Sequence, residues 1–392
     1  MRSWLLFVLV FWLLGNSQAQ QKDSVQVDII DLLFGKKKQE KVDQIRAERK
    51  VYFSILPAAV SVPGGGRAVI TSINAAFYTG NAEETNLSNI YLIPYTNLGD
   101  RYGLYIRPNI WFPKNTINFI GDYRIAHFPQ YTWGLGGDTP EWERSLIDSD
   151  YLRFYQNALF QINKGYWYVG PGYALDYHYN ISESEYTGEG HLDRYEDTPN
   201  SSTTSSGVTA NLVYDARKNA INPPNGSYII ISWRWNDTKL GSTYTNNSLF
   251  IDGRKYIPLS NTRMNLIALR SYYWTILNGE TPYLDLPATN WAPVSGISSR
   301  GFEIGRYRSN AMVYAEAEHR YQVSRNGLWG LVGFVNLASA SEFDTEHFRH
   351  WQLAGGVGLR TKLNKFSNAN IAIDFGFSQN YWGIWLNIGE MF

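Results

Sequence analysis

Residues able to catalyse a reaction are sparse in this sequence. It contains no cysteine, so it has no thiol nucleophile, no disulfide and no thiolate metal site. Its six histidines are scattered without the spacing of a metal site, and neither a Gly-x-Ser-x-Gly nor a His-Glu-x-x-His motif occurs. We therefore expect no catalytic residue, no metal and no cofactor, and we do not expect an enzyme.

Carboxylates gather in one polar stretch, at Glu183, Glu185, Glu189 and Asp193. Oxygen ligands of this kind could bind a divalent cation. A solvated loop is the favoured interpretation, because polar, acidic stretches of this kind commonly remain solvated.

Most other charged side chains alternate with apolar ones, which indicates β-strands. In 311–323, alanines, Val313 and Tyr321 share one parity, whereas Glu316 and Glu318 share the other; 369–377 opposes apolar residues to Asp374 in the same way. Sixteen such segments follow from residue 51 onward, bounded by Gly, Pro, Asn, Asp or Ser. Charges confined to one face of each strand suit a barrel with a wet lumen and a lipid-facing exterior. A soluble β-sandwich alternates in the same way, with its apolar face inside and its polar face outside, so alternation alone does not distinguish the two folds.

The connections distinguish these two folds. Short links near 113–115, 163–165, 259–261, 324–327 and 364–368 alternate with long ones near 129–148, 182–207 and 278–310, with one longer turn at 217–226 as the exception. Outer-membrane barrels have this regularity, with short turns on one side and long loops on the other. We predict an all-β fold, a sixteen-stranded antiparallel transmembrane β-barrel.

The barrel is predicted to span residues 51–392. Its last strand is expected to run to Phe392, with one lipid-facing row made of Trp382, Ile384, Leu386, Ile388 and Phe392. Aromatic residues make up 16% of the chain while mean hydropathy is only −0.32, which suits aromatic girdles around strands with one wet face. The formal net charge of zero argues against nucleic acid as a partner.

The N-terminus resembles an export signal. Arg2 precedes an apolar run over 4–14 and a small-x-small cleavage site at 17–19, so residues 1–19 are predicted to be a signal peptide. Residues 20–50 would then form a periplasmic segment, either a tether or a short amphipathic helix that lies on the membrane or plugs the lumen. We expect a bacterial outer-membrane protein with both termini in the periplasm, in contact with outer-membrane lipid and with other outer-membrane or periplasmic proteins as candidate partners.

Several motifs resemble the BamA/TamA-like (bacterial surface antigen) outer-membrane superfamily. Ser-Arg-Gly-Phe at 299–302 resembles the family's Val-Arg-Gly-Phe/Tyr loop motif. Three further features match in the family's order: the Tyr-Asp-x-Arg-x-Asn and Pro-Gly turn over 214–226, the glycine-rich strand at 354–360 and the final Phe392. Each motif alone is weak, but the combination is specific. The thirty residues before the first strand are too few for even one of the soluble domains that members usually carry.

The resemblance implies roles for named residues. The loop motif Arg300, Gly301 and Phe302 would fold into the lumen, where a guanidinium needs a carboxylate partner. The lumen-facing candidates are Glu316, Glu318 and Asp374, with the neutral Asn336 standing where many members have an aspartate; a solvated Arg300 is the alternative. For the turn motif Asp215, Arg217 and Gly226, ordinary turn chemistry is the favoured explanation. Phe392 would be the C-terminal assembly signal.

The resemblance also implies a function. The expected role is assembly, insertion or translocation of a protein or lipid at the outer membrane, through the seam between the first and last strands. One alternative is a scaffold barrel that binds a periplasmic or membrane partner without transport. The other is a passive solute channel, which a lumen sealed by the Arg300 loop would disfavour.

Overall fold

The computed structural model describes residues 26–33, 50–61, 67–97, 102–184, 190–195, 201–260, 264–293 and 298–392. The expected signal peptide at 1–19 and most of the expected segment 20–50 lie outside the described residues. Over the described ranges, none of the helices has both the length and the apolar character needed to cross a membrane.

Regular structure in these ranges is almost all β-strand. The strands are β1 (Val51–Ser61), β2 (Arg67–Phe77), β3 (Ser88–Thr96), β4 (Tyr102–Trp111), β5 (Ile117–His127), β6 (Gln130–Thr132), β7 (Ser145–Ile162), β8 (Trp167–Ser184), β9 (Ser202–Asp215), β10 (Gly226–Asn236), β11 (Asn246–Pro258), β12 (Asn265–Gly279), β13 (Ala311–Gln322), β14 (Trp329–Ala340), β15 (Gln352–Asn364), β16 (Ala369–Ser378) and β17 (Trp382–Ile388). The helices are short: α2 (Ile29–Leu33), α4 (His191–Tyr195), η1 (Pro113–Asn115), η2 (Glu141–Glu143), η3 (Thr238–Leu240) and η4 (Tyr283–Asp285).

The strands form one up-and-down antiparallel barrel. Each wall strand pairs with the next along the chain, from β1–β2 to β16–β17. The three-residue β6 pairs only with β7, beyond the end of β5, so it adds no strand to the wall. The prediction of sixteen antiparallel wall strands is therefore confirmed.

Side chains alternate across the wall as the sequence predicts. On β15, Leu353 and Val357 are 64% and 63% exposed to the outside, whereas on β13 Glu318 and Arg320 are 1% and 2% exposed within the barrel. Because rows of exposed large apolar side chains would be unfavourable in water, the outer face is suited to lipid.

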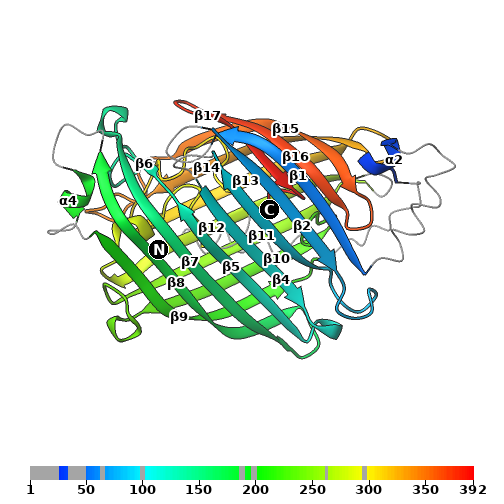
Figure 1. The fold of residues 1–392 in the computed structure, drawn as a ribbon, viewed down its shortest axis with the longest axis horizontal. Helices are drawn as coiled ribbons and strands as arrows, with labels where there is room; N and C mark the ends of the chain where they lie inside the picture. The colour runs from blue at the N-terminus through cyan, green and yellow to red at the C-terminus, as the bar shows by residue number, and fades with distance from the viewer. Residues whose placement is uncertain are drawn as a thin grey trace.

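The barrel has two distinct ends. We call the end that carries α2 the turn end and the end that carries α4 the loop end (Figure 1). The predicted short links all lie at the turn end, but the 217–226 turn and the β2–β3 connection there are longer, and the β16–β17 connection at the loop end is short. Alternation of link length is thus a tendency in this barrel and not a strict rule.

The expected course of the last strand is wrong. β17 ends at Ile388, and Phe392 is only 4% exposed, because its ring packs inside the barrel beside Tyr256 at a centroid distance of 6.3 Å. Trp382 and Ile384 do face outward, at 65% and 57% exposure. Phe392 therefore does not end a lipid-facing row, because the chain turns into the lumen after Ile388.

Candidate functional site

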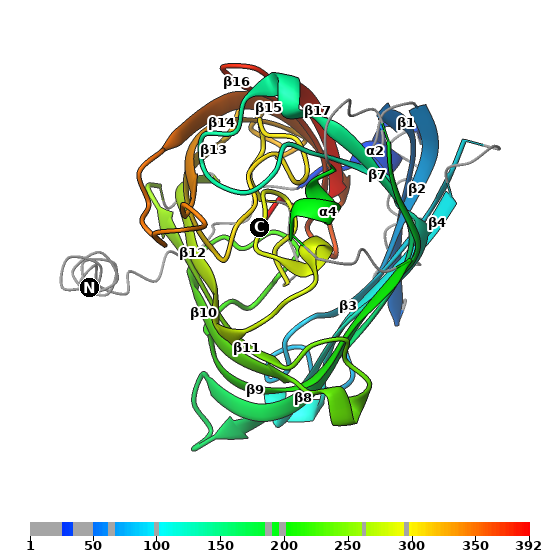
Figure 2. The ribbon, with the colours of Figure 1, turned by 90° about the vertical axis from the view of Figure 1, so that its left-hand side faces the viewer.

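The segment between β12 and β13 enters the barrel from the loop end. Figure 2 shows this yellow segment within the ring of strands. The motif turns sharply there, since Ser299 and Gly301 have φ of 55° and 93° and the Phe302 amide donates to the Ser299 carbonyl at 3.0 Å. A Cβ on Gly301 would lie 2.7 Å from the Ala354 Cβ, so only glycine lets the loop approach the wall this closely.

Arg300 lies at the tip of this turn and is fully buried. Its guanidinium donates to carboxylates of Glu316 and Glu318 on β13 and of Asp374 on β16. We call this arrangement of Arg300 with Glu316, Glu318 and Asp374 the loop lock. The structure thus brings together the arginine and all three carboxylates that the sequence nominated.

Three further residues, Asn336, Phe334 and Phe302, pack around the loop lock. Asn336 donates from its side-chain amide to the Arg300 carbonyl at 2.8 Å, so it binds the backbone and not the guanidinium. The Phe334 ring lies 3.8 Å from the centre of the guanidinium, a cation–π contact that the sequence did not reveal. Phe302 is 2% exposed and packs edge-on against Tyr307 at 5.9 Å.

The loop lock continues into a larger ionic network toward the turn end. Arg320 donates to Glu318 at 2.5 Å, and Arg360 pairs with Asp374 and donates to Glu390 at 2.6 Å. The sequence interpretation missed Arg320, Arg360 and Glu390. The alternation along β13 could have identified Arg320, because it lies two residues after Glu318 and therefore on the same, lumen-facing side of the strand.

Other arginine–carboxylate clusters line the lumen beside the lock. Asp176 accepts from Arg153 at 3.0 Å and from Arg234 at 2.7 Å, and Trp291 of the entering segment lies 5.1 Å from the Arg153 guanidinium. Asp252 likewise pairs with two arginines of β11 and β12. The lumen is thus lined by paired charges, and the inserted segment contacts them from the loop end.

The turn motif is buried and not a solvated turn. Asp215 and Arg217 are 4% and 7% exposed, and their side chains form a two-bond fork at 2.9 and 2.8 Å. Burial alone would lower the pKa of the Arg217 guanidinium, but the Asp215 carboxylate outweighs this and raises the pKa. Asp215 also accepts from the Arg217 amide at 3.0 Å, as expected of ordinary turn chemistry, and Gly226 has φ of 102°.

The rest of this turn reaches across the turn end to the last strands. Asn219 donates to the Ser367 carbonyl at 3.0 Å, and Asn222 donates to the Asn368 carbonyl at 3.2 Å. The Ile221 carbonyl accepts from the Glu390 amide at 2.8 Å. The turn over 214–226 is therefore hydrogen-bonded both to the β15–β16 turn and to the chain that follows β17.

The first and last wall strands meet without a ladder. Among the described residues, the ladders run from β1 to β17 and none joins β17 back to β1. Instead the end of β17 packs through side chains against the first strands. Fully buried Ile388 contacts Tyr52 and Leu56 of β1, and the Tyr91 hydroxyl of β3 donates to the Ile388 carbonyl at 2.9 Å. We call this contact the overlapped seam.

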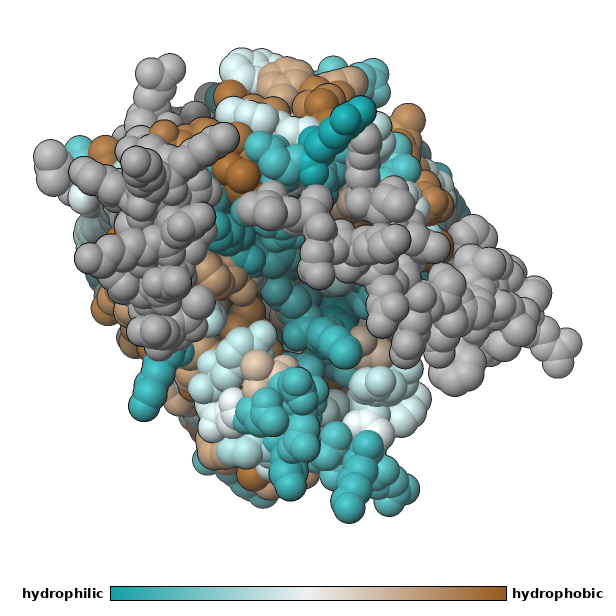
Figure 3. All heavy atoms as spheres, turned by 90° about the vertical axis from the view of Figure 1, so that its right-hand side faces the viewer, coloured by the Kyte–Doolittle hydropathy of each residue, from teal (hydrophilic) through white to brown (hydrophobic). Residues whose placement is uncertain are grey.

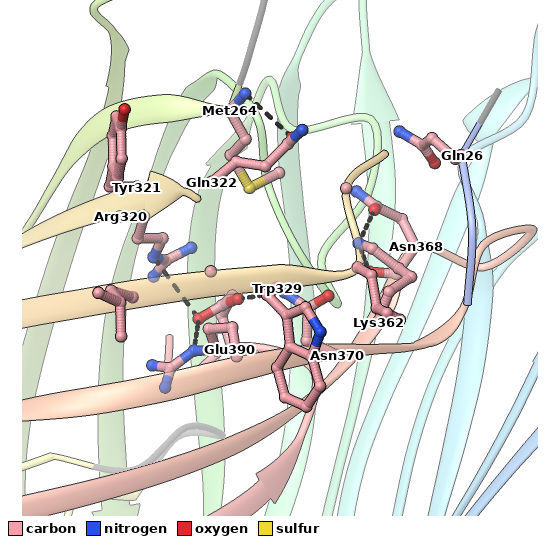
Figure 4. A pocket seen from close by; sticks show the side chains of 15 residues that line it. Gln26, Met264, Arg320, Tyr321, Gln322, Trp329, Lys362, Asn368, Asn370 and Glu390 are labelled. Atoms are coloured by element: carbon pink, nitrogen blue, oxygen red, sulfur yellow. Dashed lines mark hydrogen bonds and ion pairs between the residues drawn. The ribbon is translucent and has the colours of Figure 1, made fainter. Parts of the chain in front are cut away.

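The described part of the N-terminal segment, residues 26–33, packs against the turn end of the barrel. Asp31 pairs with Lys365 of the β15–β16 turn at 3.0 Å, Asp28 accepts from the Lys365 amide at 3.0 Å, and the Val27 amide donates to Asn326 of the β13–β14 turn. Figure 3 shows hydrophilic residues around a recess at this end. A cavity of about 30 Å³ there is lined by several polar and charged side chains (Figure 4), among them Gln26, Arg320, Gln322, Arg360, Lys362, Asn370 and Glu390.

The acidic stretch at 183–193 does not form a metal site in its described residues. Glu183 accepts from the amides of His191 and Leu192 at 3.0 Å each, so it caps α4, while Glu185 and Glu189 lie outside the described residues. Over the part of the chain that the structure describes, no group of three or more His, Cys, Asp or Glu residues is arranged to hold a metal ion.

Comparisons with known proteins point to one family. The model of the Omp85 superfamily domain matches residues 103–392. No curated protein matches the chain.

Solved structures show a similar fold at low identity. CdiB from Acinetobacter baumannii is 11% identical with a TM-score of 0.53, over 87% of this chain and 60% of that one, so this chain spans less than two thirds of it. BamA from Haemophilus ducreyi, solved without POTRA domains 1–3, is 13% identical with a TM-score of 0.48, over 87% of this chain and 69% of that one. The likeness to CdiB shows the barrel fold alone.

Proposed function

Since this chain belongs to the Omp85 superfamily, we propose that its outer-membrane barrel assembles, inserts or translocates a protein or lipid substrate through the overlapped seam. In this role the protein catalyses no reaction, and its turn end faces the periplasm. The observation that carries it is that, among the described residues, no ladder joins β17 to β1.

The seam supports this function because its energetics differ from those of the rest of the wall. Elsewhere, neighbouring strands are held by continuous backbone hydrogen bonds, which must all be broken to open the barrel. At the seam, opening separates side-chain contacts: the apolar packing of Ile388 with Tyr52 and Leu56 and the stacked rings of Tyr52 and Phe366. It also breaks two side-chain hydrogen bonds, from Tyr91 to the Ile388 carbonyl and from Asn364 to the Phe53 carbonyl. Local opening draws on the least stable contacts of a structure, so this is the place where the wall opens most readily.

The loop lock distinguishes this proposal from a passive solute channel. A channel needs a continuous wet lumen, whereas Arg300 and Phe302 of the inserted segment are 0% and 2% exposed within the barrel. Removing the segment would strand three carboxylates without their shared cation, so the described arrangement favours an occupied lumen.

A reducible crosslink across the seam tests the proposal. The natural chain has no cysteine, so the pair Tyr52→Cys and Phe366→Cys, whose native rings stack at 5.8 Å, can be joined by a short disulfide-containing linker between β1 and the β15–β16 turn. Proteoliposomes holding the protein should accelerate the folding of a urea-unfolded outer-membrane barrel; crosslinking should abolish this acceleration and reduction should restore it.

The matched control is a crosslink of the same kind away from the seam. Tyr166 and Tyr214 are also adjacent at the turn end, with ring centroids 5.9 Å apart, on the β7–β8 connection and β9. The variant with Tyr166→Cys and Tyr214→Cys should stay active when crosslinked. A barrel that never accelerates client folding over empty liposomes would support the scaffold alternative, and a seam crosslink without effect would remove the seam from the mechanism.

A further inference from the structure

The chain leaves the barrel wall immediately after β17. Gly389 has φ of 93°, and a Cβ there would lie 2.7 Å from the Ile221 carbonyl oxygen. The backbone is held on both sides of the bend, since the Gly389 amide donates to the Asn370 carbonyl at 2.7 Å and the Glu390 amide donates to the Ile221 carbonyl at 2.8 Å. Residues 389–392, which we call the inner segment, therefore occupy one defined position inside the lumen.

The inner segment is bound by both apolar and ionic contacts. Met391 is fully buried, and the Phe392 ring lies 5.3 Å from the Arg320 guanidinium and 5.9 Å from that of Arg270. Glu390 accepts from Arg360 at 2.6 Å and from Asn370 at 2.7 Å, and it lies 3.7 Å from Arg320. The same two arginines that bind Glu390 thus also bind carboxylates of the loop lock.

Two chains of alternating charge connect the loop lock to the inner segment. One runs from Arg300 through Glu318 and Arg320 to Glu390. The other runs from Arg300 through Asp374 and Arg360 to Glu390. With Glu316, the network holds three arginines and four carboxylates, all nearly excluded from solvent.

Charge balance makes the two ends of this network interdependent. If Arg300 leaves, the network retains two arginines, Arg320 and Arg360, for its four buried carboxylates, so both shift toward Glu318 and Asp374 and bind Glu390 less well. If Glu390 leaves, the same two arginines bind Glu318 and Asp374 more fully and compete with Arg300. Because buried charges need close partners, each withdrawal lowers the affinity at the other end.

We propose that docking of the inner segment and insertion of the loop motif 299–302 are coupled, each stabilising the other through Glu318 and Asp374. The fold thereby contains a two-site latch: withdrawal of the loop at one end of the barrel loosens the chain next to the overlapped seam. This inference does not rest on the proposed function, since it concerns only the resting barrel.

Single cysteines in the cysteine-free chain measure both sites. Met391→Cys reports on the inner segment, and Ser298→Cys, at a position that is 3% exposed, reports on the loop. In nanodiscs, Arg300→Gln should raise the rate at which a hydrophilic maleimide labels Cys at 391 by about fivefold or more. Coupling is reciprocal, so Glu390→Gln should raise the labelling rate at 298 by a similar factor.

Asp176→Asn is the matched control, because it removes one buried carboxylate from the separate cluster of Arg153 and Arg234. It should leave the labelling rate at 391 unchanged, because this cluster contacts the inserted segment through Trp291 and not the inner segment. Heat-modifiable migration verifies that every variant is folded. If Arg300→Gln does not fold, Arg300→Lys should give a smaller rise in the same direction. A variant that exposes the loop reporter and leaves the rate at 391 unchanged would overturn the coupling.

Discussion

At the scale of single residues, the decisive feature is one cation shared by three carboxylates. Glu316, Glu318 and Asp374 are 4%, 1% and 0% exposed, so each has lost its hydration and pairs with the guanidinium of Arg300. Glu318 and Asp374 also pair with Arg320 and Arg360, respectively. A planar group with five donors can bind several carboxylates at once, which a lysine ammonium cannot do with the same geometry. The loop lock is therefore specific for arginine as well as for positive charge.

We predict that Arg300→Ala lowers the melting temperature of the barrel substantially. Breaking a buried pair from one side typically costs about 3 to 5 kcal/mol, whereas losing an exposed charge costs about 0 to 1. Thermal unfolding in detergent checks this, with Arg325→Ala as the control because Arg325 is exposed in the β13–β14 turn. Equal melting temperatures for the two variants would contradict the loop lock.

The same substitution should change conductance. Freeing the loop segment from the lumen is expected to raise single-channel conductance in planar bilayers above that of the wild type. A wild-type pore that is already large and steady, and that Arg300→Ala leaves unchanged, would support the passive-channel alternative.

At the scale of elements, the last strand differs most from expectation. β17 supplies lipid-facing side chains only in its first half, and the chain then bends so that Ile388 packs behind β1 and Phe392 enters an internal cluster with Tyr256, Leu266 and Ala268. The aromatic residue at 392 therefore contributes to the inner packing of the barrel, whatever its role as an assembly signal.

We predict that Phe392→Ala both destabilises the barrel and reduces its insertion into the membrane. Truncating a buried phenylalanine typically costs about 3 to 5 kcal/mol. Trp382→Ala is the control, because Trp382 lies on the preceding strand but is 65% exposed to the outside. Melting temperature and the membrane-inserted fraction are the measurements; equal effects on the melting temperature would place Phe392 among the lipid-facing residues after all.

At the scale of the whole molecule, topology relates the two ends of the barrel to the two sides of the membrane. An even number of wall strands means that β1 begins and β17 ends at the same end, which also carries α2 and the family turn. With this turn end in the periplasm, the inserted segment would enter from the cell surface and the overlapped seam would reach the periplasmic side.

We predict that cysteines at Lys239 and Glu346, both exposed at the loop end, react with an impermeant maleimide on intact cells. Cysteines at Lys164 and Asn326, both exposed at the turn end, should react only after the outer membrane is permeabilised. The reverse pattern would invert the orientation and with it the side from which substrate reaches the seam.

Local patterns were sufficient to predict the fold class. Alternation with period two and turn-forming residues between strands are properties of neighbouring residues, so sixteen wall strands and the lumen-facing parity of Glu316, Glu318 and Asp374 could be read directly from the sequence. The sequence also nominated Arg300 and its three carboxylates as residues of one site.

Only the tertiary structure decided how distant residues meet. Arg300 and Asp374 are 74 positions apart, and their contact depends on the loop entering the lumen and on the closure of the wall. Phe392 has the same parity as the apolar residues of β17, but the bend at Gly389, set by contact with Ile221 of a remote turn, moves it inside. Periodicity specifies which face a residue occupies within a strand, whereas strand ends and ion-pair partners depend on packing between segments that are far apart in the chain.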